Sequence, residues 1–254
     1  MRAPILAIFL ALCLCLFMVA GPETPRASDN NVTDINVTGD RQRANRLIYG
    51  FLQTVFGTEH DKGWWFSGAN RVKKYTVPVQ FYVHNRSRKD RRRAAEAFVG
   101  KLSDHIPGFT GTMAASPENA NFHLFIVDRK DFKDTVVREA GLSVGAVQSA
   151  ECLVHIWFGR KGISESRAVI VSDGGEHLFN RCLVEEVLQG LGPINDSRDL
   201  HESVFNDYSR HSSLTKFDRS LLQMLYHPAI KPGMVRRDVV RILPKVLTDL
   251  QLSH

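Results

Sequence analysis

The sequence lacks the glycine-rich motifs with which the common nucleotide-binding enzymes hold phosphates. Neither G-x-x-x-x-G-K-[ST] nor G-x-G-x-x-G occurs in its 254 residues. Both motifs work by turning backbone N–H groups toward phosphate oxygens where a helix begins. Their absence argues against an ATPase and against a dinucleotide-dependent enzyme.

Cysteine is scarce. The chain has four cysteines, and two of them, Cys13 and Cys15, lie within an apolar N-terminal run. The remaining pair, Cys152 and Cys182, predicts a single disulfide if the protein folds in an oxidising compartment. Two buried thiols, or Cys182 as a metal ligand, are the alternatives.

Apolar residues form a long run at the N-terminus. Arg2 precedes an apolar stretch over residues 4–20, which ends at Gly21-Pro22 before a polar segment. This order is typical of a secretory signal peptide, which we assign to residues 1–21. A membrane-spanning helix needs about 20 apolar residues, so the run is slightly short for one, and an uncleaved anchor is the alternative. We expect an exported protein, periplasmic or secreted, without an integral membrane span in the mature chain.

The charge balance is moderately basic, with 33 Lys and Arg against 27 Asp and Glu. Six of the basic residues fall in the segment 86–93, at the start of a predicted helix. An exported protein rarely meets nucleic acid, so we expect no nucleic-acid partner. The segment is either a solvated helix face or a surface that binds an anionic component of the cell envelope.

Hydrophobic periodicity predicts an α+β domain with a mixed, mostly parallel sheet. Residues 22–40 are polar and lack an apolar period, which indicates a flexible linker before a single domain over residues 41–254. Helices are expected at residues 41–56, 88–106, 177–191, 215–226 and 236–250, the last kinked or split at Pro244. Strands are expected at residues 77–83, 121–127, 152–158 and 168–171.

The helix at 177–191 is the most informative segment. At about 100° per residue, Cys182, Glu185 and Gln189 fall on one face, while leucines and valines point the other way. The helix is therefore expected to bury an apolar back in the core and to present a polar front to a cleft. Glu186 lies at the flank of that front.

This segment resembles the zinc motif of the metzincin peptidases, H-E-x-x-H-x-x-G-x-x-H. In that motif two histidines on one helix face bind zinc, the glutamate activates the bound water, and the glycine lets a third histidine return. In this chain Glu186 and Gly192 match the motif. Glu185, Gln189 and Asn195 stand where the three histidines would be.

A second likeness to metzincins of the matrixin type lies downstream. Ser203-Val204-Phe205 resembles the turn beneath the zinc, with Phe205 in the place of a methionine, and the helix that follows has the form L-T-x-x-D…L-Y. The resemblance covers residues 75–230 and implies a metzincin-like fold. Because the histidines are replaced, it implies a degenerate metal site.

More narrowly, the chain is similar to a bacterial family of exported proteins known as domain of unknown function 2927. The similarity rests on C-L-V-E-E-V-L-Q-G-L-G-P-I-N-D, on S-V-F-N-D and on L-Y-H-P-A-I-K-P-G-M. It implies export and a shared fold, and it implies no particular activity.

The replaced positions make a cofactor unexpected. Amide oxygens are weak ligands for zinc, and one carboxylate does not hold the ion. Calcium accepts carboxylate and amide oxygens, and several donors lie nearby, but their spacing matches no calcium loop. These donors are Asp196, Asp199, His201, Glu202 and Asp207. A hydrogen-bonded network of Glu185, Gln189 and Asn195 that closes the cleft is our first expectation.

Three functions follow from these observations. The first is a non-catalytic pseudoprotease that binds a peptide, a protein or an anionic envelope component. The second is an active metallopeptidase or hydrolase with Glu186 as general base and an atypical metal site. The third is a cationic structural protein of the envelope that acts through residues 86–93.

Overall fold

The computed structural model describes residues 30–56, 70–147, 150–206 and 208–252. The predicted signal peptide and residues 22–29 of the predicted linker lie outside this part of the chain. The chain divides into two units, and the folded body belongs to the second, Gly39–His254. None of the helices in the described ranges combines the length and the apolar character needed to cross a bilayer.

A five-stranded sheet forms the centre of the body. Its strands are β1 (Val79–Asn85), β2 (Gly111–Met113), β3 (Phe122–Val127), β4 (Cys152–Gly159) and β5 (Gly162–Val171). They lie in the order β2-β1-β3-β5-β4. All neighbours are parallel except β4 and β5, which form an antiparallel hairpin. The predicted α+β class with a mixed, mostly parallel sheet is confirmed.

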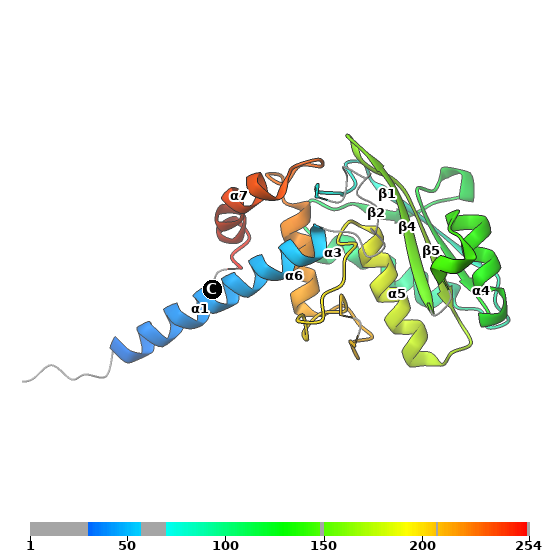
Figure 1. The fold of residues 1–254 in the computed structure, drawn as a ribbon, viewed down its shortest axis with the longest axis horizontal. Coiled ribbons are helices and arrows are strands. Elements are labelled where there is room, and N and C mark those ends of the chain that lie inside the picture. Colours follow the sequence, from blue (N-terminus) through cyan, green and yellow to red (C-terminus); the bar gives the residue numbers. More distant parts are fainter. Residues whose placement is uncertain (1–29, 57–69, 148–149, 207, 253–254) are drawn as a thin grey trace, which may run out of the picture. The chain divides into compact units, whose positions relative to one another are not determined.

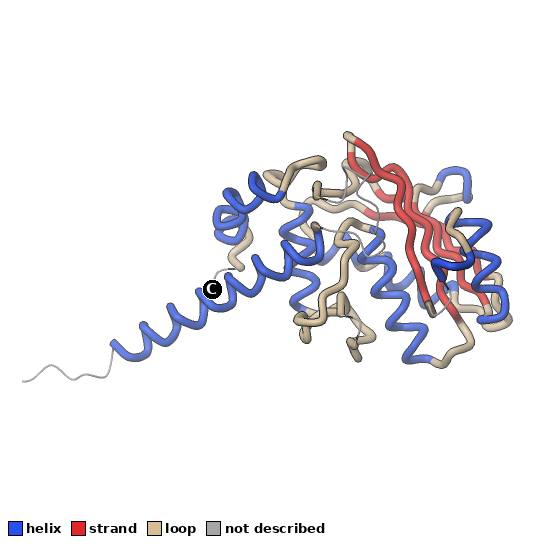
Figure 2. Tube along the Cα trace, in the orientation of Figure 1, coloured by secondary structure: helices blue, strands red, loops and turns tan. Residues whose placement is uncertain are grey.

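Helices cover both faces of this sheet (Figures 1 and 2). The helices of the domain are α1 (Asn30–Val55), α2 (Arg92–Val99), α3 (Leu102–His105), α4 (Arg129–Thr135), α5 (Glu176–Gly190), α6 (Lys216–Tyr226) and α7 (Arg236–Asp249). Side chains alternate between the two faces of a strand. Phe81, Phe122 and Ile170 therefore join the main core with α5, whereas Phe125 and Val169 join a smaller core beneath α4.

Five elements differ from the sequence-based expectations. The helix expected at 88–106 is divided into α2 and α3 at Gly100, and α1 begins at Asn30, inside the predicted linker. Extending an existing helix needs no new nucleus, so polar residues can continue one. Helix α7 runs through Pro244 as one element instead of splitting. Strand β2 and helix α4, with its π-helical continuation Val136–Ala140, were not expected.

Candidate functional site

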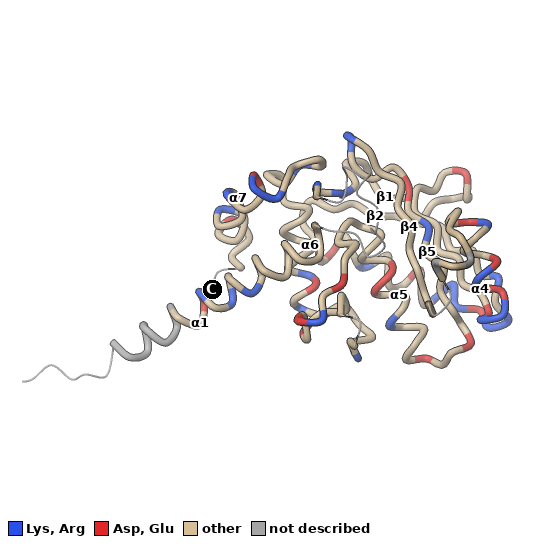
Figure 3. The backbone as a smooth tube through the Cα atoms, viewed as in Figure 1, with Lys and Arg blue, Asp and Glu red and all other residues tan. Residues whose placement is uncertain are grey.

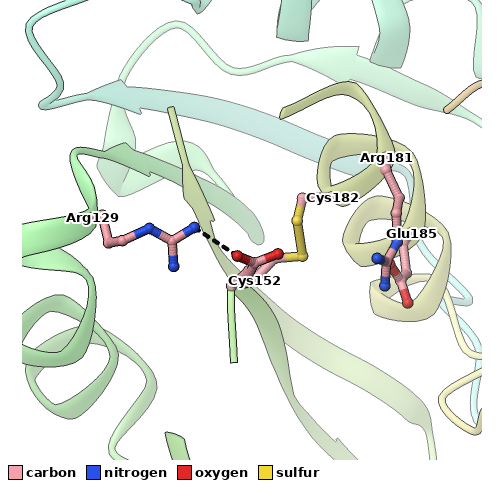
Figure 4. Close-up of a disulfide and its surroundings, with 6 residues drawn as sticks. Arg129, Cys152, Arg181, Cys182 and Glu185 are labelled. Atoms are coloured by element: carbon pink, nitrogen blue, oxygen red, sulfur yellow. Dashed lines mark hydrogen bonds and ion pairs between the residues drawn. A yellow bond between two sulfur atoms is a disulfide. The ribbon is translucent and has the colours of Figure 1, made fainter. Parts of the chain in front are cut away.

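The predicted disulfide is present and joins the edge of the sheet to α5. Cys152 at the start of β4 and Cys182 in the middle of α5 are linked, with their Cα atoms 5.7 Å apart. Figure 4 shows the bond spanning the space between the strand and the helix, with Arg181 and Glu185 on the adjoining part of the helix. The disulfide therefore lies beside the positions that resemble a zinc motif.

The polar front of α5 does not line an open cleft, contrary to the sequence-based expectation. Glu185, Glu186 and Gln189 are 5%, 4% and 4% exposed. The helix is in fact buried on almost every side between Phe179 and Gly190. Helical periodicity shows which residues share a face, but it does not show what covers that face. Here β4, held by the disulfide, and the loop after α5 cover it.

At two of the three positions that replace histidines, the side chain interacts with a charged neighbour. The Arg181 Nε atom lies 3.2 Å from a carboxylate oxygen of Glu185, one helical turn away. Gln189 donates a hydrogen bond from Nε2 to Oδ1 of Asp196, at 3.0 Å. The guanidinium group of Arg181 is thus a cation next to Glu185.

The third position, Asn195, fixes the loop after α5 to the C-terminal end of α1. Its backbone N–H donates to the Thr54 carbonyl at 3.1 Å, and its side-chain amide donates to the Gln53 carbonyl at 2.9 Å. The amide also bonds to the backbone carbonyl of Asp196. Asn195 therefore holds two segments of the same chain together.

These residues do not fit a catalytic zinc ion. Cys152, Glu185 and Glu186 form a group of ligand atoms within 4.8 Å of one another, but a disulfide-bonded sulfur offers no thiolate. Glu185 faces Arg181, and the Gln189 and Asn195 amides are used as donors. A zinc site needs three strong nitrogen, sulfur or carboxylate ligands turned toward one point.

The residues considered for calcium do not converge either. Asp196 accepts from Gln189, Asp199 accepts from the Tyr49 hydroxyl at 2.9 Å, and Glu202 pairs with Arg46 at 2.6 Å. Among the described residues, His201 joins no metal-binding group, and Asp207 lies outside them. The candidate calcium ligands are near one another in sequence, but in the structure each makes a different contact.

The turn at Ser203–Phe205 is buried and organised by Asp218. Ser203 Oγ donates to Oδ1 of Asp218 at 2.5 Å, and the backbone N–H of Phe205 donates to Ser203 Oγ at 3.0 Å. Asp218 also forms a capping box with Thr215 at the start of α6. Burial raises the pKa of Asp218, and the hydrogen bonds it accepts from Ser203 and Thr215 act against that shift. Phe205 itself is fully buried.

Arg181 is the site residue that sequence reasoning missed. The signal for it was present, because an arginine four residues before a glutamate on a helix can form an ion pair. From the sequence, Glu185 is expected at a replaced metal position and in a network with Gln189 and Asn195, without Arg181. Its spacing to Arg181 would have predicted the pair.

The sequence contains one G-x-S-x-G pattern, at residues 141–145. In serine hydrolases this pattern forms a sharp turn between a strand and a helix, which exposes the serine. Here it follows the π-helical turn Val136–Ala140 instead of a strand, and Ser143 is exposed. The structural context of a nucleophile is therefore missing.

The basic segment 86–93 is largely engaged in ion pairs within the chain. Arg86 pairs with Glu139 at 2.7 Å, and Arg88 pairs with Asp128 at 2.8 Å. Lys89 and Arg91 both contact Glu176, which lowers the pKa of that carboxyl group to about 2. Figure 3 accordingly shows acidic residues among the basic ones near α4. Arg92 and Arg93 remain exposed.

Comparison with known proteins identifies the family. No functionally curated protein matches the chain. The family model described as "Protein of unknown function (DUF2927)" matches residues 44–245, which span α1 to α7 and include every residue of the site described above. The chain therefore belongs to the DUF2927 family.

Proposed function

We propose that this chain is an exported, metzincin-like pseudoprotease, which binds a peptide or a cell-envelope component without cutting it. The main support for the proposal is the set of contacts made by the three side chains that replace histidines. Glu185 is paired with Arg181, Gln189 with Asp196, and Asn195 with the backbone of α1. Each side chain is thus engaged in a contact within the chain. We infer that these positions have a structural role in place of metal binding.

The order of the elements supports the metzincin-like framework. Glu186 lies in the last half of α5, and Gly192 follows with a φ of 136°, a conformation that turns the chain as the resemblance implies. The turn at Ser203–Phe205 comes next, and a capped helix, α6, follows it. The disulfide and the absence of a membrane-crossing helix in the described ranges are compatible with export.

We place the bound peptide along the outer edge of β4. This strand ends the sheet, and within the described residues it pairs only with β5. An edge strand presents a row of backbone N–H and C=O groups, to which an extended peptide can add as a further strand. Trp157 and Phe158 lie on this strand beside its irregular register, and both could contact side chains of the peptide.

Metal analysis and cleavage assays test the non-catalytic part of the proposal. We expect purified mature protein to contain no stoichiometric zinc and to leave a pool of fluorogenic peptides uncut. Glu186→Gln should not change this result. Stoichiometric zinc, together with cleavage that Glu186→Gln abolishes, would establish the active metallopeptidase in its place.

Glu185→Ala separates the two functions further. In an enzyme with Glu185 as ligand, the substitution removes turnover. In a pseudoprotease it lowers the free energy of unfolding, because Arg181 loses its partner, and peptide binding at β4 persists in the folded variant. Loss of binding in a variant that melts at the wild-type temperature would contradict this.

Hydrogen exchange locates the binding. A peptide selected from a random extended library should slow amide exchange in β4 (Cys152–Gly159) more than in the other strands, while a scrambled peptide should not. Protection confined to another surface, such as the exposed arginines of α2, would favour the cationic structural protein and refute docking at β4.

A further inference from the structure

A cavity of about 310 Å³ is lined in part by α5 but by neither cysteine of the disulfide and by none of Glu185, Glu186 and Gln189. It is formed by α2, α3, the N-terminal half of α5, the loop before α6, and α6 itself. Its apolar wall includes Phe98, Leu183 and Leu214, and its polar wall includes Lys101, His105 and Arg219. Three separate segments of the sequence therefore meet around it.

The polar wall carries nitrogen donors and no acids. None of the residues lining the cavity is Asp or Glu. Within the described part of the chain, the side chains of Lys101, His105 and Arg219 take part in no ion pair or side-chain hydrogen bond. In addition, Arg219 Nε is buried without a protein acceptor. A buried donor on a charged group is costly to leave unpaired, so an anion in this cavity would be stabilised.

This arrangement contrasts with the rest of the basic surface. Arg86, Arg88 and Arg91 all have carboxylate partners. The cationic groups of the cavity differ because no acid of the described chain neutralises them. The apolar lining residues make a purely polar ion a poor ligand, since Phe98 and Leu214 would stay in contact with water.

We propose that this cavity binds a small organic anion with a carboxylate or phosphate head and a short apolar body. The head would accept hydrogen bonds from Arg219 and Lys101, because a guanidinium group matches both carboxylate and phosphate. The body would lie against Phe98, Leu183 and Leu214. The volume is near the lower limit of small-molecule sites, which favours a ligand of this size over a folded partner.

Calorimetric titration of the full mature protein tests this with octanoate, octyl phosphate and octylammonium. These three probes share the same alkyl chain and differ in the head. We expect octanoate or octyl phosphate to bind with one-to-one stoichiometry, at least about tenfold more tightly than octylammonium. The comparison of the two anions shows whether the natural ligand carries a carboxylate or a phosphate.

Substitutions identify the site. Arg219→Gln should weaken anion binding about tenfold or more, because it removes a charge-assisted hydrogen bond. Arg237→Gln is the matched control: it removes the same charge from α7, where the arginine is 76% exposed, and should leave binding unchanged. Equal affinity for octanoate and octylammonium would overturn the proposal. Unchanged octanoate binding by a folded Arg219→Gln variant, verified by thermal melting, would also overturn it.

Discussion

At the residue scale, one buried carboxylate group of α5 has a cation beside it. Glu185 is 5% exposed and lies beside Arg181, whose side chain is 26% exposed. Desolvation of a carboxylate costs several kcal/mol, which a well-placed cation offsets only partly. The pair is therefore expected to matter most when one member is removed and the other stays buried.

Arg181→Leu should lower the free energy of unfolding by about 2–4 kcal/mol, because Glu185 loses its cationic partner. The double variant Arg181→Leu/Glu185→Leu should be more stable than the single one, because it leaves no buried charge. Urea unfolding measures both. Arg237→Leu, at an exposed position, is the control and should change stability little. Additive losses in the double variant would show that the pair is not coupled.

A second pair, His84 and His123, makes stability depend on pH. His84 Nε2 and His123 Nδ1 are 3.1 Å apart on neighbouring strands, β1 and β3. Burial, and then His123 and Arg86, lower the pKa of His84 to about 4, and burial lowers the pKa of His123 as well. The fold therefore favours the neutral form of both rings.

The sign of the pH effect follows from these shifts. An unfolded histidine has a pKa near 6.5, so the unfolded chain binds more protons than the folded one between about pH 6.5 and 4. The stability contributed by neutral His84 is therefore complete above that window and is lost as the pH falls through it. His84→Gln should reduce the loss of stability between about pH 7.5 and 4.5 by roughly 1–2 kcal/mol, after allowance for solvent screening at this half-buried ring.

Urea unfolding at the two pH values measures this difference. His201→Gln, which replaces an exposed histidine on the loop after α5, serves as the control. The prediction fails if His84→Gln and the wild type lose the same stability on acidification.

Among the elements, the end of α5 shows how closely the chain segments pack. Gly190 lies against Phe122, and an added Cβ would come within 2.4 Å of its ring. Gly192 has a φ of 136°, and a Cβ there would come within 2.2 Å of the Lys73 carbonyl oxygen. Gly190 is therefore required because a side chain would not fit there. Gly192 is required both for its backbone conformation and because a side chain would not fit.

Gly192→Ala should destabilise the protein by about 2–4 kcal/mol, because backbone atoms must move and the φ value becomes strained. Gly190→Ala should cost about 1–3 kcal/mol through overpacking against Phe122. Gly159→Ala is the control, since nothing lies within 4 Å of its added Cβ. Thermal melting ranks the three variants, and a neutral Gly192→Ala would be inconsistent with the close contact to Lys73.

Strong local patterns made some of these elements predictable. Helix α5 and helix α6, with its Thr215 and Asp218 capping box, follow from periodicity and capping residues. Strand β2 has three residues, and its pairing with β1 is a tertiary effect that no local pattern reveals. The burial of Glu185 and Gln189 was equally hidden, because it depends on β4 and on the loop held by Asn195. Strand β4 comes from another part of the sequence, and the loop is held in place by hydrogen bonds from Asn195 to α1, which is distant in sequence.

For the molecule as a whole, the antiparallel strand β4 is one of the two edge strands of the sheet. It pairs with β5 on one side only, whereas β1, β3 and β5 each have two neighbours. The disulfide between Cys152 and Cys182 compensates for this by linking β4 directly to α5 in the main core. The same link keeps the edge of β4 in place for the proposed peptide.

Cys152→Ala/Cys182→Ala should lower the free energy of unfolding by about 3–4 kcal/mol, as expected for a link that closes a 30-residue loop in the unfolded chain. A reducing agent should destabilise the wild type to a similar extent and should leave the variant unaffected, which separates the bond from other effects of the agent. Below the unfolding transition, amide exchange in the variant should be accelerated relative to the wild type, and the acceleration should be larger in β4 than in β1. The reason is that the edge strand has lost its covalent link to α5. Uniform acceleration across the sheet would instead indicate that the disulfide stabilises the whole fold without holding this edge in place.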